Sequence, residues 1–159
     1  MRHLIYTLIA ILIAIFTQSC VAVNVASNKV SEIKAKTVNN PHVLAKGTKF
    51  SNNKEQKKWS NSTGDSYFSA NFAEFSGTAY MELTVSKPLI LRVSHNINIS
   101  SGTLKMILED SKSNAVFSKS INGDSKESIQ YQIPDSGTYY LKMTGNDTDG
   151  SYFCQWEEL

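Results

Sequence analysis

Hydrophobic and polar positions alternate with a period of two along most of the chain from Ser66 onward. The clearest example is Tyr139, Leu141 and Met143, which are separated from one another by single residues. Such alternation is typical of a β-strand with one buried face. Comparable sets predict strands over residues 67–75, 78–85, 89–97, 104–108, 115–121, 129–133, 138–144 and 152–156.

Residues with turn chemistry separate these sets, among them Ser76-Gly77, Ser101-Gly102 and Asn122-Gly123. Residues 145–150 are too polar and too rich in glycine for regular structure, so we expect the strands on either side to form an antiparallel hairpin. About eight short strands without a helical period predict an all-β fold. An antiparallel, jelly-roll-like β-sandwich is the first choice and a small barrel the second.

The inward-facing members of the alternating sets predict the core. They are Met81, Leu83, Leu91, Val93, Leu104, Met106, Leu108, Ile129, Tyr131, Tyr139, Leu141, Tyr152 and Trp156. We place this β-sandwich domain at residues 66–159, a length that can fold alone.

The N-terminal residues have the pattern of an export signal. Arg2 provides the charged start, and Leu4 to Phe16 is an apolar run of 13 residues. A membrane-spanning helix needs about 20 apolar residues, so this run suits the core of a signal peptide better. We therefore predict a signal peptide over residues 1–19 and an exported protein.

Thr17-Gln18-Ser19-Cys20 follows the apolar run. This stretch resembles the lipobox of bacterial lipoproteins, in which a small residue precedes a cysteine that is acylated after cleavage. Thr17 and Gln18 depart from the usual residues of that motif. The resemblance implies lipidation of Cys20 and a protein anchored to a membrane of the bacterial cell envelope. The alternative is a soluble secreted protein.

The chain has two cysteines, Cys20 and Cys154. If Cys20 carries lipid, Cys154 has no partner in the chain, and its place between Tyr152 and Trp156 predicts a buried thiol that behaves as a small hydrophobe. If Cys20 is not lipidated, a disulfide between the two becomes an alternative in an oxidising compartment.

Residues 20–65 are poorly patterned and rich in Asn, Ser, Lys and Thr. Residues 21–65 hold eight Lys against three acids, whereas residues 66–159 hold seven Lys and Arg against eleven acids. We interpret the basic stretch as a polar spacer between the anchor and an acidic body, with Trp59 docking on that body. An acidic body without a basic stripe does not suit nucleic-acid binding.

Three segments carry a wider resemblance: Gly102 to Asp110, Ser136 to Gly145, and Gly150 to Trp156. Together they are similar to the pre-peptidase C-terminal domain and to small bacterial envelope lipoproteins with the same β-hairpins. The resemblance implies a β-sandwich and no particular chemistry. No peptidase is attached, so the role of that domain as an appendage of secreted enzymes does not carry over.

Few residues in the sequence indicate catalysis. We find no phosphate-binding loop, no metal-spaced Cys/His cluster and no nucleophile elbow, so we predict neither an enzyme nor a cofactor or metal. His95 lies in mid-strand and is expected to be a hydrogen-bonded structural residue. Asp147-x-Asp149-Gly150 has a faint likeness to a calcium loop, but Trp156 stands where the bidentate Glu is needed.

Three aromatic residues fall out of phase with the core, namely Tyr80, Tyr140 and Phe153. Outward aromatics on a sandwich can stack against sugar rings or anchor a protein partner, and they are our candidate ligand-binding residues. We predict a non-catalytic envelope lipoprotein that binds a glycan, a wall polymer or a protein. The alternative is a secreted enzyme inhibitor or a small surface hydrolase.

Overall fold

The computed structural model describes residues 38–159, and all regular structure in that range is β-strand. The strands are β1 (Val43–Thr63), β2 (Tyr67–Val85), β3 (Leu89–Asp110), β4 (Ala115–Ile121), β5 (Ser125–Ile133) and β6 (Gly137–Glu158). All pairings are antiparallel, so the predicted all-β antiparallel class is confirmed. No helix in this range is long and apolar enough to cross a membrane.

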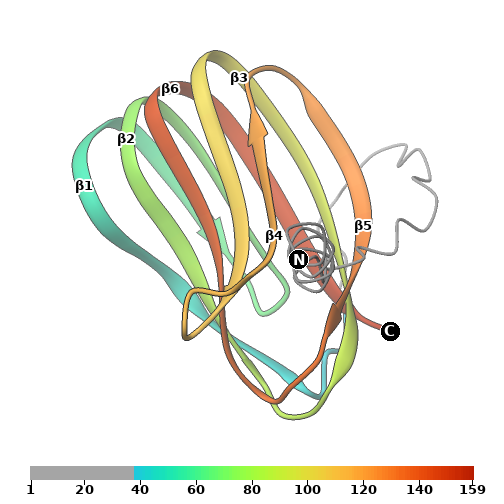
Figure 1. The fold of residues 1–159 in the computed structure, drawn as a ribbon. Coiled ribbons are helices and arrows are strands. Elements are labelled where there is room, and N and C mark those ends of the chain that lie inside the picture. Colours follow the sequence, from blue (N-terminus) through green and yellow to red (C-terminus); the bar gives the residue numbers. More distant parts are fainter. Residues whose placement is uncertain (1–37) are drawn as a thin grey trace, which may run out of the picture.

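Four of the strands are long and arch over, so that each contributes to two layers (Figure 1). The strand order is β1-β2-β6-β3, and β3 pairs with β5 along its first half and with β4 along its second half. We call layer A the half that contains 43–51, 78–85, 104–110, 115–121 and 137–145. Layer B contains 57–63, 67–72, 89–99, 125–133 and 150–158.

Side chains from the two layers meet between them, which makes the folded sheet a β-sandwich. Phe117 in β4 stacks on Tyr131 in β5 with ring centroids 4.2 Å apart. The two halves of β1 also meet, because the hydroxyls of Thr48 and Thr63 lie 2.8 Å apart. Burial of the inner faces supplies most of the stabilisation of such a fold.

The predicted turns at Ser76-Gly77 and Ser101-Gly102, and the predicted loop at 145–150, are the bends of continuous strands. Strand register shifts at these places, and Gly102 adopts a φ of +75°. A Cβ at Gly102 would lie 2.3 Å from the carbonyl oxygen of Asp147, so the bends of β3 and β6 approach closely only because this residue is glycine. The eight predicted strands therefore become five, β2 to β6, and β1 is a sixth strand that the sequence did not predict.

The hairpin predicted around residues 145–150 is wrong. Residues 138–144 and 152–156 are the two halves of β6 and lie in different layers. Asn122-Gly123 likewise joins β4 in layer A to β5 in layer B, so it connects the layers and closes no hairpin. Sequence periodicity cannot tell a turn from a sharp bend, because both interrupt the alternation with the same polar and glycine residues.

The core matches the alternating pattern closely. All the predicted core residues are buried except Ile129 and Tyr131, which are half-buried in the edge strand β5. Aromatic residues in layer B and at the bend of β2 add to this core, as Phe68, Phe72 and Phe75 are also buried. Cys154 is buried as predicted and is a free thiol.

Strand β1 corrects the predicted domain boundary. Residues 43–63 fall within the predicted polar spacer. They form a strand that pairs with β2 from Val43 to Thr63. Trp59 docks as expected, with its ring centroid 5.6 Å from that of Phe72 and 4.9 Å from that of Phe75. The register of β1 shifts four times, and such irregularity hides the period of two that identifies a strand in a sequence. The predicted signal peptide at 1–19 and Cys20 lie outside the described residues.

Candidate functional site

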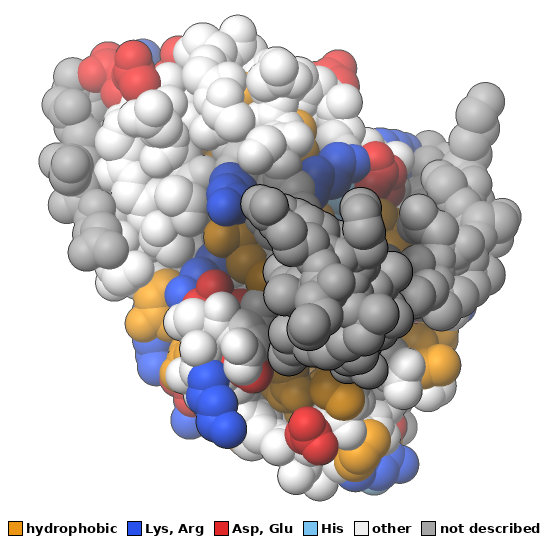
Figure 2. All heavy atoms as spheres, in the orientation of Figure 1, with side chains coloured by type: hydrophobic (Ala, Val, Ile, Leu, Met, Phe, Trp, Pro, Cys, Tyr) orange, Lys and Arg blue, Asp and Glu red, His pale blue; other side chains and the backbone are white. Residues whose placement is uncertain are grey.

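The two outer faces of the sandwich differ in chemistry. We call the outer face of layer B the polar face, because it carries mainly amides and hydroxyls: Ser69, Asn71, Ser94, Asn96, Asn98, Ser128, Gln130, Gln132, Ser151 and Gln155. We call the outer face of layer A the charged face, after Lys46, Lys49, Glu82, Glu109 and Lys142. In Figure 2 uncharged atoms dominate the upper left, over the arched strands, and charged groups are more frequent below.

The three aromatic residues predicted to bind a ligand do not form one site. Tyr80 and Tyr140 contact each other edge to face on the charged face, with ring centroids 5.8 Å apart. Phe153 lies on the polar face, where it stacks on Tyr67 at 5.7 Å and an interplanar angle of 19°. The sequence placed all three out of phase with the core correctly. It could not show that β6 changes layer between Tyr140 and Phe153.

On the charged face, the charges pair with one another. The Glu82 carboxylate accepts hydrogen bonds from Lys46 at 2.6 Å and from Lys49 at 2.8 Å, and these bonds lower its pKa. Lys142 pairs with Glu109 and lies 5.6 Å from the centre of the Tyr140 ring. The aromatic pair on this face is therefore surrounded by ion pairs.

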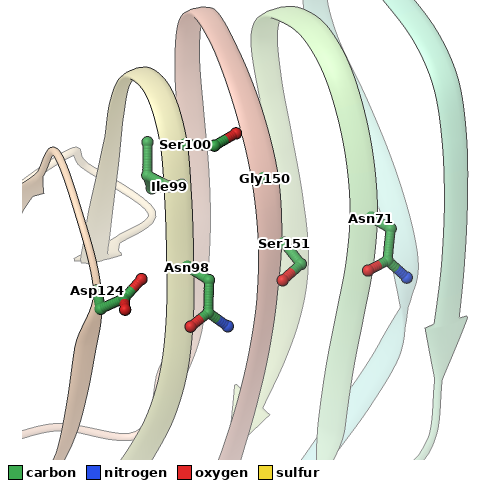
Figure 3. A pocket seen from close by; sticks show the side chains of 7 residues that line it. All are labelled: Asn71, Asn98, Ile99, Ser100, Asp124, Gly150 and Ser151. Carbon is green, nitrogen blue, oxygen red and sulfur yellow. The ribbon is translucent and has the colours of Figure 1, made fainter.

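A shallow pocket of about 350 Å³ opens on the polar face. Its floor crosses neighbouring strands, since Asn71 of β2 is the register partner of Ser151 of β6, and Ser151 is the partner of Asn98 of β3. Figure 3 shows these side chains next to one another, with Asp124 beyond β3. The lining residues are Asn71, Asn98, Ile99, Ser100, Asp124, Gly150 and Ser151.

The stacked pair lies next to this pocket. Phe153 is two residues along β6 from Ser151 and is the register partner of Ser69 and Asn96. Both rings of the pair are half-buried, so part of their surface remains open. A fixed aromatic surface beside several donors and acceptors can bind a ligand with an apolar face and polar edges. Sequence reasoning missed Tyr67, although its position one residue before Phe68 already implied an outward side chain.

Asp149 holds the bends at the rim of the pocket together. Its carboxylate accepts hydrogen bonds from the backbone N–H of Glu74 and the hydroxyl of Ser101, both at 2.7 Å. The bond from Glu74, followed by that from Ser101, lowers the pKa of Asp149. Asp149 thus joins β2, β6 and β3, which accounts for the acidic loop that faintly resembled a calcium site. Within residues 38–159 no group of three His, Cys, Asp or Glu is placed to hold a metal ion.

His95 is a buried, hydrogen-bonded residue, as the sequence predicted. Its Nε2 lies 2.9 Å from the Ser125 hydroxyl, and Lys119 bridges Ser125 and Glu127 between the layers. Burial lowers the pKa of His95 to about 4. The Nδ1 atom has no hydrogen-bond partner among the described residues, whereas a histidine that activates a serine is oriented there by an acid. The Ser125–His95 pair therefore lacks the third group of a triad.

Cys154 belongs to the same interior. Its thiol is completely buried, and this burial raises its pKa. A neutral, enclosed thiol is a poor nucleophile, because only the thiolate attacks. The structure thus places Cys154 in the core between Tyr152 and Trp156 and away from both outer faces.

The fold and the polar face define an antiparallel β-sandwich with a candidate binding surface on one layer. No protein-family model matches the chain, and no curated protein matches its sequence. The resemblance to the pre-peptidase C-terminal domain therefore stays a prediction.

Several solved structures have a similar arrangement of strands. A CBM4 structure is 6% identical and covers 66% of this chain and 77% of its own, with a TM-score of 0.47. TmCBM61 in complex with beta-1,4-galactotriose is 13% identical over 70% of this chain and 87% of its own, with a TM-score of 0.45. The carbohydrate binding module CBM6cm-2 from Cellvibrio mixtus lichenase 5A, in complex with cellotriose, is 8% identical and covers 71% and 97%, with a TM-score of 0.40.

Proposed function

We propose that this protein is an exported, lipid-anchored binding module whose polar face binds a glycan. The observation that carries the proposal is the stacked Tyr67–Phe153 pair beside the pocket formed by Asn71, Ser151 and Asn98. A sugar ring has an apolar face and an edge of hydroxyl groups. The apolar face of the sugar would stack on the ring pair, and its hydroxyl groups would hydrogen-bond to the row of amides and hydroxyls. The solved structures described above have TM-scores below 0.5, and the proposal does not rest on them.

The polar face supports a glycan over a protein partner because of its composition. Protein interfaces are enriched at their centres in large apolar, aromatic and Arg side chains. Around the pocket, the polar face instead carries a dense set of Asn, Gln and Ser beside one aromatic pair, and its Ile90 and Arg92 lie outside the pocket lining. Among its members, Asn71 and Asn98 are exposed. Binding through such a face requires no acid, base or nucleophile, in keeping with a non-catalytic role.

The first prediction is that removing one ring of the stacked pair weakens glycan binding. Phe153→Ala should lower the affinity for a bound polysaccharide about tenfold or more, because it removes the stacking surface and the support that keeps Tyr67 flat. Affinity gel electrophoresis against a panel of soluble polysaccharides would measure the effect.

Tyr140→Ala is the matched control, since it removes an outward ring from the same strand on the charged face. It should leave the retardation of the protein by polysaccharide in the gel unchanged. Both variants should keep a melting temperature within a few degrees of that of the unaltered protein. If Tyr140→Ala abolishes binding and Phe153→Ala does not, the ligand lies on the charged face. If no polysaccharide in the panel retards the unaltered protein, glycan binding itself is refuted.

The anchor is a separate part of the proposal and rests on the lipobox resemblance around Cys20. The intact mass of the protein from a bacterial membrane fraction tests it. A mass that corresponds to cleavage before Cys20 plus acyl chains supports the anchor. A soluble, unacylated chain would leave a secreted module in place of an anchored one.

A further inference from the structure

The polar side chains of the pocket form a row that runs across the strands of layer B. Asn71, Ser151 and Asn98 are register partners on three adjacent strands, and Asp124 directly precedes Ser125, the partner of Ile97 on the next strand. Neighbouring strands lie about 4.8 Å apart, so the row from β2 to β5 spans roughly 14 Å across the sheet. A row of this length can contact several linked sugar rings.

The chemistry of the row is almost uncharged. Amide groups donate and accept hydrogen bonds, and a serine hydroxyl does both, which matches the hydroxyl groups of a sugar. Among the residues that line the pocket, Asp124 alone carries a charge, and that charge is negative. The cations of the polar face, Arg92 and Lys126, lie outside the pocket lining, and the opposite outer face holds Lys46, Lys49 and Lys142.

Both neighbours of Asp124 are held in place. The carbonyl oxygen of Gly123 accepts a hydrogen bond from the backbone N–H of Ile99 at 3.3 Å. The hydroxyl of Ser125 is bonded to the buried His95 at 2.9 Å. Contacts on either side thus hold the backbone of Asp124 at the mouth of the pocket, where its exposed carboxylate faces the solvent that a ligand would replace.

We propose that the pocket selects a neutral polysaccharide and that Asp124 is the specificity-determining residue that turns acidic polymers away. This inference rests on the proposed function and names its ligand class. A carboxylated or phosphorylated chain lying along the row would bring its negative groups close to Asp124, and a lysine or arginine to compensate does not line the pocket. A neutral chain meets only donors and acceptors.

The experiment compares neutral and acidic polysaccharides on the full chain and on two variants. The probes are galactan, glucomannan and hydroxyethyl cellulose on the neutral side, and polygalacturonate and a teichoic acid on the acidic side. We expect the unaltered protein to bind at least one neutral probe and neither acidic one. Asn98→Ala should weaken the neutral binding by about three- to tenfold, which is the loss of one hydrogen bond.

Asp124→Asn tests the selection itself. It should raise the ratio of polygalacturonate binding to neutral-probe binding about fivefold or more at low salt. The matched control is Asp135→Asn, which makes the same charge change at an exposed turn outside the pocket. Asp135→Asn should alter neither affinity.

The possible results separate this inference from the proposed function. If the unaltered protein binds acidic probes better than neutral ones through a Phe153-dependent site, the inference is wrong and glycan binding stands. The inference is also wrong, and glycan binding again stands, if Asp124→Asn changes nothing for the acidic probes or if Asn98→Ala leaves the neutral affinity unchanged. If no probe of either class binds, the proposed function and the inference fall together.

Discussion

At the scale of single residues, His95 connects the pocket to the interior of the sandwich. It is buried on the inner face of β3, and its Nε2 lies beside the hydroxyl of Ser125, which follows the pocket residue Asp124. Three other groups contribute to its surroundings: Lys119 from β4, Glu127 from β5 and Cys154 from β6. Burial outweighs the attraction of Glu127 and leaves the imidazole neutral at pH 7.

The stability of the domain should therefore fall as the solution becomes acidic. The pKa of His95 is lowered from 6.5 to about 4, so the unfolded chain takes up this proton before the folded one does. The contribution of neutral His95 to the free energy of unfolding is present above pH 6.5. It is lost as the pH falls towards 4, by about 3 kcal/mol in total. Urea unfolding at pH 7, 6, 5 and 4.5 measures this loss.

His95→Gln is the comparison for that profile, because Gln keeps a group that can bond Ser125 and does not titrate. The variant should be less stable at pH 7 and should lose less stability between pH 7 and 4.5. An equally steep profile in the variant would assign the acid sensitivity to other groups. The carboxylates of Glu82, Asp110, Asp149 and Glu158, whose pKa values are also lowered, lose their contribution mainly below about pH 4.5.

At the scale of elements, β1 is the strand that the sequence concealed. Its polar composition suggested a spacer, yet it covers the edge of β2, and its Val43 and Trp59 pack on the core. Asn40 and His42, just before β1, also hydrogen-bond to the end of β6, since the backbone N–H of Glu158 donates to Asn40 at 2.8 Å. The N-terminal part of the described chain is thus built into the sandwich.

This arrangement predicts that the domain cannot be cut at residue 66. A chain of residues 38–159 should fold, whereas a chain of residues 66–159 should lack a cooperative thermal transition. The shorter chain leaves the hydrogen-bonding edge of β2 open and removes Trp59 from Phe72 and Phe75. Circular dichroism during heating measures the thermal transition of each chain. Equal melting temperatures for the two chains would refute the role given to β1.

The sequence predicted individual strands well and their connections poorly, for a physical reason. Alternation reports which side of a strand faces the core, and it correctly assigned Met81, Leu141 and Trp156 to the inside and Tyr80 and Phe153 to the outside. Which layer a segment joins depends on pairing between distant residues, and periodicity carries no information about that. The polar face depends on the passage of β6 from layer A to layer B, which periodicity does not reveal.

At the scale of the whole molecule, the two layers are one structure. Strands β1, β2, β3 and β6 pass through both layers, and the inner side chains of each pack on the other. One layer cannot open without pulling on the strands of its neighbour. Unfolding should therefore be a single cooperative event.

Two optical signals test this expectation. Trp59 and Trp156 both lie in layer B, so tryptophan fluorescence follows that layer, while far-ultraviolet circular dichroism follows the strands of both. The two signals should give the same midpoint in guanidinium chloride. A fluorescence transition that clearly precedes the dichroism transition would show that layer B unfolds separately.

Strand β6 joins the molecule together, and its place in the chain sets the order of events during synthesis. It lies between β2 and β3 in both layers, and β2 and β3 do not pair with each other. The β1–β2 unit and the β3–β4–β5 unit consequently have no sheet in common until residues 137–158 leave the ribosome. A chain that must pass through a secretion channel has to remain unfolded on the way. In an exported protein, delaying the central strand until last would keep the domain open for transport and let it close only after crossing.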